Sequence, residues 1–190
     1  MGVGSGGKKE DRFSVTGEFT VEVPVPPSIL WETVADVDST PHYIYSVVSV
    51  ERIDGSLKGD ELRVGTKWKE VRQYQGRDIS MVKTVHGVGS KGSPYPRIFA
   101  VNVNFPGTSL QNTSTIIVSP GVASVGSDDK VEEASTSLMA GTFVGLPSGL
   151  FFKLKMIIFG RSIRKSTREM FLRELDDIAV ESKRRYEASR

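Results

Sequence analysis

The hydrophobic period of this 190-residue chain changes once, near residue 150, and that change limits the folds it can adopt. Before this point, short runs alternate apolar and polar residues, as strands with one buried face do. After it, apolar residues recur every three or four positions from Leu150 to about Tyr186, the spacing of an amphipathic helix. Such a helix would be roughly 50 Å long at about 1.5 Å per residue. The chain therefore pairs an antiparallel sheet with one helix long enough to cross a whole domain.

Seven segments have the length and alternation of strands. The first, Phe13 to Val25, places valine and phenylalanine on one face and serine, threonine and glutamate on the other. Two short helices are predicted after it, one over Ile29 to Val34 and a second starting near Pro41. The other six strands are predicted at Val47–Asp54, Glu61–Tyr74, Ile79–Val88, Arg97–Phe105, Leu110–Val118 and Val131–Val144, with Gly145 to Gly149 as a loop before the long helix.

Composition narrows the class of protein. The chain has no cysteine, which excludes disulfides, thiolate nucleophiles and cysteine-ligated metal sites. A net charge of +2 is too balanced to indicate a nucleic-acid-binding protein, and we expect no such partner. Residues 1–12 are predicted to form a flexible tail and residues 13–190 a single domain. No apolar signal segment or transmembrane run is evident, so we expect a cytoplasmic location.

Three features in chain order carry a family resemblance. The first is the opening stretch, with Trp31 in the first short helix, Asp36 at its end and Val47 to Glu51 as the next strand. The second is the strand entry L-R-V-G-T-K-W at Leu62 to Trp68, and the third is the amphipathic final helix. In this order, over about residues 13–187, the chain resembles the START-like helix-grip (SRPBCC) superfamily, particularly its polyketide cyclase/dehydrase and lipid-transport members.

The resemblance implies an α+β helix-grip fold: a seven-stranded, curved antiparallel sheet wrapped around a long C-terminal helix, with two short helices after the first strand. It also implies a hydrophobic cavity between sheet and helix that takes a lipid, sterol, quinone or polyketide-like molecule, with no cofactor. Plain core packing is the alternative for each lining residue. Asn102 and Asn112 are candidates to orient a ligand. The residues predicted to contact it are Trp68, Met81, Val101, Val103, Leu138, Phe151, Leu154 and Ile158.

The polar run D-V-D-S-T-P-H, from Asp36 to His42, has two readings: a metal or acid/base site, or the end of one helix and the start of the next. We favour the second, because Asp, Ser and Thr cap helices and build turns. The other histidine, His86, has no spacing that brings it to His42, so we expect no metal site. No nucleophile motif is present. A cyclase/dehydrase-type enzyme remains the alternative to a binding protein, with His86, Tyr74 and Glu70 as the groups to test.

The first half of the long helix carries basic residues without an acidic one among them. A solvated helix face is one interpretation. The other is a lipid carrier that docks on anionic membranes, because clustered cations are attracted to such surfaces. The basic residues are Lys153, Lys155, Arg161, Arg164, Lys165 and Arg168.

Overall fold

A computed structural model describes residues 14–74, 76–90, 92–106, 110–121, 136–147 and 150–190. Its elements follow the order expected from the sequence: one strand, short helices, six further strands and a long helix. They are β1 (Val15–Val23), α1 (Pro27–Ala35), a 3₁₀ turn (Val37–Ser39), α2 (Thr40–Tyr43), β2 (Val47–Arg52), β3 (Lys67–Tyr74), β4 (Arg77–Val88), β5 (Arg97–Asn104), β6 (Leu110–Pro120), β7 (Ser137–Pro147) and α3 (Leu150–Ala188).

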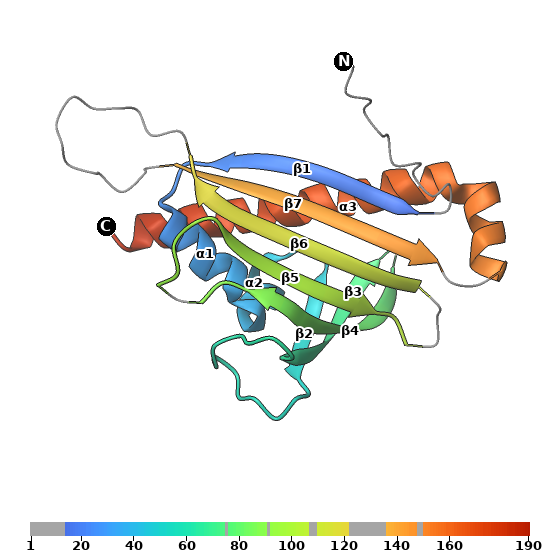
Figure 1. Cartoon of the computed structure of the whole chain (residues 1–190), viewed down its shortest axis with the longest axis horizontal. Helices are drawn as coiled ribbons and strands as arrows, with labels where there is room; N and C mark the ends of the chain where they lie inside the picture. Colours follow the sequence, from blue (N-terminus) through green and yellow to red (C-terminus); the bar gives the residue numbers. More distant parts are fainter. Residues whose placement is uncertain (1–13, 75, 91, 107–109, 122–135, 148–149) are drawn as a thin grey trace, which may run out of the picture.

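The seven strands form one antiparallel sheet in the order β1-β7-β6-β5-β4-β3-β2. Every strand from β2 to β7 therefore lies beside its neighbour in sequence, and β1 closes the far edge against β7. The sheet curls at its β2–β4 end, and α3 runs across its concave face (Figure 1). This is the α+β helix-grip architecture, with the two short helices after β1 as expected.

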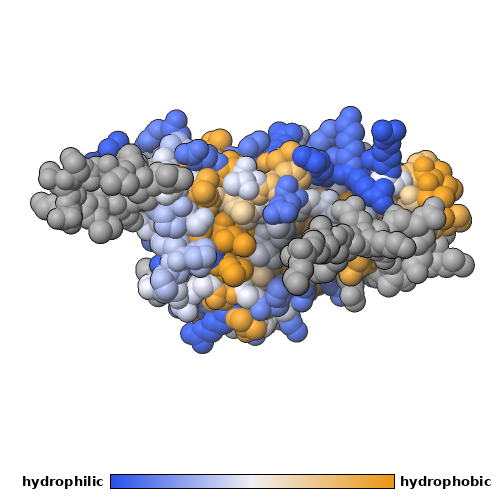
Figure 2. Space-filling view, turned by 45° about the horizontal axis from the view of Figure 1, so that its top comes forward, coloured by the Kyte–Doolittle hydropathy of each residue, from blue (hydrophilic) through white to orange (hydrophobic). Residues whose placement is uncertain are grey.

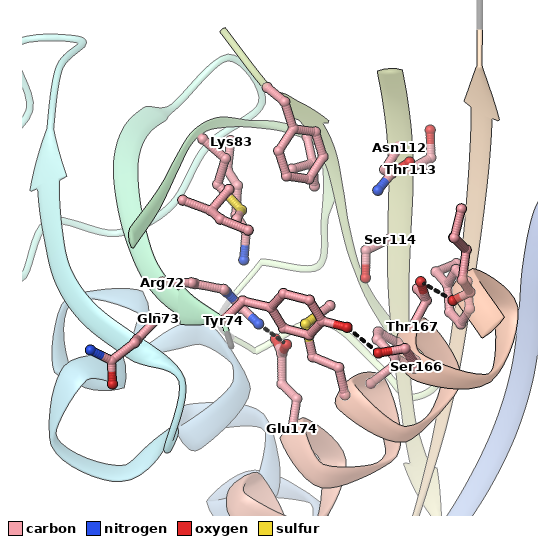
Figure 3. A pocket seen from close by; sticks show the side chains of 18 residues that line it. Arg72, Gln73, Tyr74, Lys83, Asn112, Thr113, Ser114, Ser166, Thr167 and Glu174 are labelled. Carbon is pink, nitrogen blue, oxygen red and sulfur yellow. Dashed lines mark hydrogen bonds and ion pairs between the residues drawn. The ribbon is translucent and has the colours of Figure 1, made fainter. Parts of the chain in front are cut away.

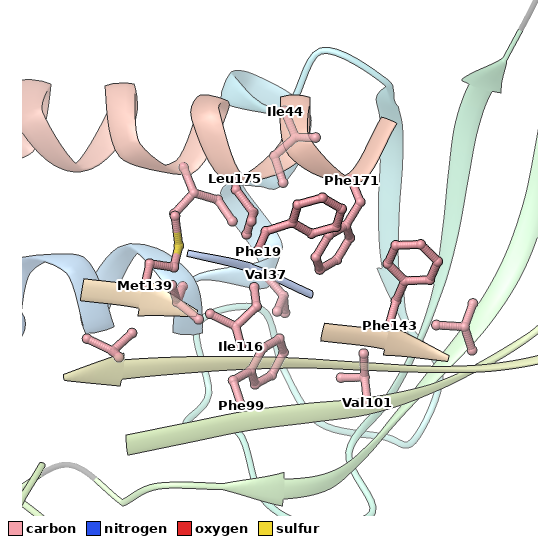
Figure 4. Close-up of a cluster of buried hydrophobic side chains, with 14 of the residues drawn as sticks. Phe19, Val37, Ile44, Phe99, Val101, Ile116, Met139, Phe143, Phe171 and Leu175 are labelled. Carbon is pink, nitrogen blue, oxygen red and sulfur yellow. The ribbon is translucent and has the colours of Figure 1, made fainter. Parts of the chain in front are cut away.

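Aromatic side chains join the sheet to α3 at the centre of the core. The rings of Phe19 in β1 and Phe143 in β7 lie 5.7 Å and 5.2 Å from that of Phe171 in α3 (Figure 4). Leu175, one turn further along α3, is fully buried. Gly141 of β7 makes this approach possible, because a Cβ there would lie 2.8 Å from the Phe171 ring. The helix is thus fixed against β1 and β7 by packing.

Carboxylates of the D-V-D-S-T-P-H run tie the short helices to the rest of the molecule. Asp36 accepts a hydrogen bond from Arg185 Nη2 at 2.8 Å, which joins the end of α1 to the end of α3. Asp38 accepts two from Arg52 of β2, at 2.9 and 2.8 Å. It also accepts one from the Gly59 N–H at 3.0 Å. The run therefore ends α1 and begins α2, with its acids in structural contacts.

Most strand boundaries lie within two residues of the predicted ones, and two differ by more: the start of β3 and the end of β7. β3 begins at Lys67, not Glu61, and Val64 is 68% exposed because residues 61–66 form a loop with Gly65 at φ +94°. β7 continues through residues 145–147, where the sequence predicts the start of a loop over Gly145 to Gly149. A Cβ at Gly145 would lie 2.7 Å from Asn112 Oδ1 on β6, so the Asn112 side chain would have to shift to admit it. The predicted start of this strand, residues 131–135, lies outside the described residues.

Figure 1 shows α3 bent near its start, and Gly160 lies in this part of the helix. Among the described residues, no helix combines the length and apolar character needed to cross a bilayer.

Candidate functional site

A cavity of about 350 Å³ lies between the inner face of the sheet and α3. Its volume is at the lower end of the ~300–1,000 Å³ typical of ligand pockets. Strands β3 to β7 and the middle of α3 supply its wall, and most of the exposed wall is apolar (Figure 3). The apolar lining residues are Ile79, Met81, Val103, Phe105, Phe143, Ile163, Met170 and Phe171; the polar ones are Arg72, Gln73, Tyr74, Lys83, Asn112, Thr113, Ser114, Ser166, Thr167 and Glu174.

Four charged side chains form one buried cluster at this wall. Arg72 of β3 is bonded to Glu70 on the same strand, and its Nη1 lies 2.6 Å from Glu174 Oε2 on α3. Lys83 Nζ of β4 lies 2.9 Å from Glu70 Oε1. Trp68 Nε1 donates to the other Glu70 oxygen at 3.2 Å. Two cations thus balance two anions, and Arg72, Lys83 and Glu174 reach the cavity.

The cluster holds its carboxylates ionised. Burial by itself would raise the pKa of Glu70, but the adjacent Arg72 and Lys83 charges hold that pKa at about 2. Burial likewise opposes ionisation of Glu174, and Arg72 keeps its pKa below the ordinary value. For Arg72, burial would lower the pKa, whereas Glu174 and Glu70 raise it. The wall therefore presents fixed charges of both signs beside apolar surface.

Asn112 on β6 adds an unsatisfied acceptor to the cavity wall. Its Oδ1 is buried and has no hydrogen-bond partner among the described residues. A buried acceptor without a donor is costly, and a donor on a bound molecule would remove that cost. Asn102, the other predicted orienting residue, is exposed and accepts a bond from Thr113 at 3.2 Å. It does not line the cavity.

A second, outer groove of about 250 Å³ adjoins the cavity. It shares wall residues with the cavity, among them Tyr74 and Ser166. The two hydroxyls are hydrogen-bonded, which joins β3 to α3 between the two spaces (Figure 3). Tyr45, at the rim of the groove, is 74% exposed. This pair of hydroxyls therefore lies where the cavity and the groove adjoin.

The predicted ligand-contact residues are distributed over several environments. Met81 and Val103 line the cavity. Trp68 and Val101 are buried in the core, and Leu138 is half-buried on β7; none of the three lines the cavity. Leu154 and Ile158 are exposed on α3, and the Phe151 side chain lies outside the described part of the structure.

The groups named for possible catalysis also lie in different environments. His86 is exposed, Tyr74 lines the cavity, and Glu70 is buried behind it in the charge cluster. His42 is exposed as well. No three His, Asp or Glu side chains of the described residues are placed to hold a metal ion.

Sequence reasoning missed Arg72, Lys83 and Glu174, although a signal was present for the first two. Alternation along β3 places Glu70, Arg72 and Tyr74 on the same face as the buried Trp68. Lys83 similarly interrupts the apolar inner face of β4, which carries Met81 and Val85. A charged residue on an apolar face is either paired or functional. Glu174 gives no such signal, because most turns of α3 carry charged residues.

Comparisons with known proteins place the fold. No protein-family model matches the chain, and no curated protein matches it in sequence. Among solved structures, an aromatase/cyclase from Streptomyces sp. R1128 matches with a TM-score of 0.62 and 12% identity, over 90% of this chain and 95% of that one. A START superfamily protein from Mycobacterium smegmatis matches with a TM-score of 0.61 and 11% identity, over 89% and 97%.

A two-domain aromatase/cyclase from the steffimycin biosynthetic pathway matches with a TM-score of 0.65 and 11% identity. The match covers 94% of this chain and 52% of that one, so this chain corresponds to about half of the larger protein. At these identities the likeness establishes the fold, which is the START-like helix-grip fold that the sequence resembles.

Proposed function

We propose that this protein binds a hydrophobic small molecule in the cavity between the sheet and α3. The observation that carries the proposal is the cavity itself: about 350 Å³ of space with a largely apolar wall, in a place where side chains could have filled the core. Each 100 Å² of apolar ligand surface that leaves water there contributes about 2.5 kcal/mol. Lipids, sterols, quinones and polyketide-like molecules share the required apolar surface.

The polar groups on the wall support a ligand with one oxygen-bearing end. Lys83 and Arg72 can donate to a carbonyl or hydroxyl oxygen, and Asn112 Oδ1 can accept from a hydroxyl. Because these groups are few and the rest of the wall is apolar, they would fix the orientation of the ligand while burial supplies most of its affinity.

Native mass spectrometry of protein purified from its own source tests the proposal directly. A co-purifying apolar molecule is the expected result. Binding of the neutral fluorophore N-phenyl-1-naphthylamine provides a second test with a designed variant. Met81→Trp places a large ring in the cavity and should abolish fluorophore binding, whereas Ser80→Trp, on the exposed face of the same strand, should leave it unchanged. Equal binding by both variants would remove the cavity as the site.

Catalysis of the cyclase/dehydrase type is the second candidate, favoured by the ionised Glu174 and by Lys83 at the cavity wall. An intramolecular aldol closure needs a base to take the α-proton and a donor at the carbonyl oxygen, and dehydration then releases water. A linear poly-β-ketone offered to the protein should then yield a cyclised product one water lighter. Glu174→Gln and Lys83→Met should slow that conversion. If the wild-type protein binds the fluorophore but converts no poly-β-ketone, the catalytic candidate fails and ligand binding remains as the proposed function.

A further inference from the structure

The start of α3 exposes large apolar side chains to solvent. Leu154, Ile157, Ile158 and Phe159 are between 53% and 63% exposed. Residues three and four apart are neighbours on a helix, so Leu154, Ile157 and Ile158 form one stripe. Single exposed apolar residues are ordinary on soluble proteins, whereas a contiguous group indicates an interaction surface. Figure 2 shows hydrophobic atoms gathered at the end of the molecule where Figure 1 places the start of α3.

Basic side chains continue the stripe along the same face. From Ile158, steps of three, four and three residues reach Arg161, Lys165 and Arg168, all of them exposed, and Arg164 is exposed beside them. The sequence has no acidic residue from Ala134 to Arg168. The ion pair between Lys165 and Glu169 is long, at 3.9 Å, and both partners are exposed. These residues form the α3 docking face, which comprises Leu154, Ile157, Ile158, Arg161, Arg164, Lys165 and Arg168.

The opposite face of the same helical segment belongs to the cavity. Met156 and Gly160 are buried, and Ile163, Ser166 and Thr167 line the cavity wall. The docking face and the cavity thus lie on two sides of the same few turns of α3. A surface that binds the docking face is therefore brought within one helix diameter, about 10 Å, of the ligand space.

We propose that the α3 docking face binds the surface of an anionic lipid bilayer. Its apolar stripe enters the boundary between headgroups and acyl chains, and its four cations contact lipid phosphates and carboxylates. The positive charge of the face is complementary to anionic headgroups. Its adjacent apolar and basic residues match a bilayer surface, in which an anionic headgroup layer lies next to apolar acyl chains. The proposal rests on the proposed function in one respect, since the bilayer is the source or destination of the cavity ligand.

A second copy of the chain fits the docking face less well. A two-fold contact through the same face would place the four cations of one copy against those of the other. Glu169, which borders the face beside Lys165, supplies one acidic side chain against these four cations. An anionic bilayer, by contrast, can bind the apolar stripe and the basic residues of the face at the same time.

Vesicle co-sedimentation tests the proposal. The full chain should bind vesicles of phosphatidylcholine with one-third phosphatidylserine at low salt, bind pure phosphatidylcholine vesicles far less, and lose binding as salt rises. The triple variant Arg161→Gln/Lys165→Gln/Arg168→Gln should bind roughly 100-fold more weakly, at about five-fold for each charge. The matched control Lys58→Gln/Lys69→Gln/Lys183→Gln removes the same charge from exposed lysines elsewhere and should bind like the wild type.

Ile157→Ser/Ile158→Ser should weaken vesicle binding while its salt dependence persists. Equal binding by the two triple variants, or no binding at low salt, would overturn the proposal. Self-association that Ile157→Ser/Ile158→Ser abolishes, without vesicle binding, would assign the face to a second copy instead. Fluorophore binding in vesicle-free buffer separates the two proposals: the docking-face variants should retain it, and Met81→Trp should lose it while still binding vesicles.

Discussion

Arg72 and Glu174 are 102 positions apart in sequence, yet Nη1 of Arg72 donates to Oε2 of Glu174 at 2.6 Å. The contact connects β3 to the middle of α3 beside the cavity, one turn along the helix from Phe171, whose ring contacts those of β1 and β7. It therefore helps to fix the distance between the helix and the curled edge of the sheet, and with it the width of the cavity.

Removing Glu174 should destabilise the fold. Glu174→Ala leaves the buried Arg72 guanidinium with Glu70 as its remaining carboxylate, and breaking a buried pair in this way costs roughly 3 kcal/mol. The free energy of unfolding in urea measures the change. Asp176→Ala, two residues along the same helix and exposed, should change it by less than about 0.5 kcal/mol. Comparable losses in both variants would contradict the structural role of the pair.

The stability of the protein should fall steeply in acid. Glu70 has a pKa of about 2 when folded, against an ordinary value of about 4.3. Because the folded pKa is the lower one, the unfolded chain binds the proton more readily, and the contribution of Glu70 is present above about pH 4.3 and lost as pH falls towards 2. This contribution is about 3 kcal/mol, and Glu174 and Asp38, whose pKa values are also lowered, add to it.

Urea unfolding at pH 7, 4 and 3 measures this dependence. The wild type should lose stability between pH 7 and pH 3. Glu70→Gln should lose about 2 kcal/mol less over this interval, because pH 3 still lies above the folded pKa of Glu70 and the variant has no proton to take up at this position. A variant with the wild-type pH profile would show that Glu70 is not the group responsible.

Removing the hydroxyl contact between Tyr74 and Ser166, where the cavity adjoins the groove, should speed ligand exchange if ligands enter there. Tyr74→Phe removes the hydroxyl that bonds to Ser166, and one hydrogen bond of about 1 kcal/mol corresponds to a roughly five-fold faster association of N-phenyl-1-naphthylamine. Stopped-flow fluorescence measures the rate. Tyr45→Phe removes a hydroxyl from the exposed rim of the same groove and should leave the rate unchanged. An unaltered rate in Tyr74→Phe would place the entry path elsewhere.

The sequence predicted the element order because hydrophobic period reports directly on burial: alternation in Phe13 to Val25 and the three-to-four spacing after Leu150 needed no tertiary information. The boundaries of β3 and β7 depended on contacts that a pattern does not contain, such as the space that Gly145 leaves for Asn112. The apolar spacing of the long helix predicts Leu154 and Ile158 at the cavity, but both are exposed, because the direction in which a helix presents a side chain depends on how the helix lies on the sheet.

Only some of the residues that line the cavity can be identified from the pattern of the sequence. Val103 belongs to the alternating apolar face of Arg97 to Phe105, whereas both faces of Ile79 to Val88 mix apolar and polar residues and do not single out Met81. Glu174 could be found only from the placement of α3 against β3. The pairing of a charged residue on a helix with one on a strand is a tertiary contact, and composition carries no trace of it.

Gly141 should tolerate no side chain, because it sets how closely α3 lies to β7. A Cβ at this position would lie 2.8 Å from Cε1 of Phe171 and 3.0 Å from Cδ1 of Leu175, both buried. Gly141→Ala should therefore reduce the free energy of unfolding by about 1–3 kcal/mol, as overpacking does.

Gly87→Ala is the matched control: it also lies in a strand, and its nearest neighbour would be Ala100 Cβ at 3.4 Å. We expect its stability to change by less than about 1 kcal/mol. If α3 moves outward to accept the new methyl group, fluorophore affinity should change in Gly141→Ala alone, which would show that the helix position sets the cavity width.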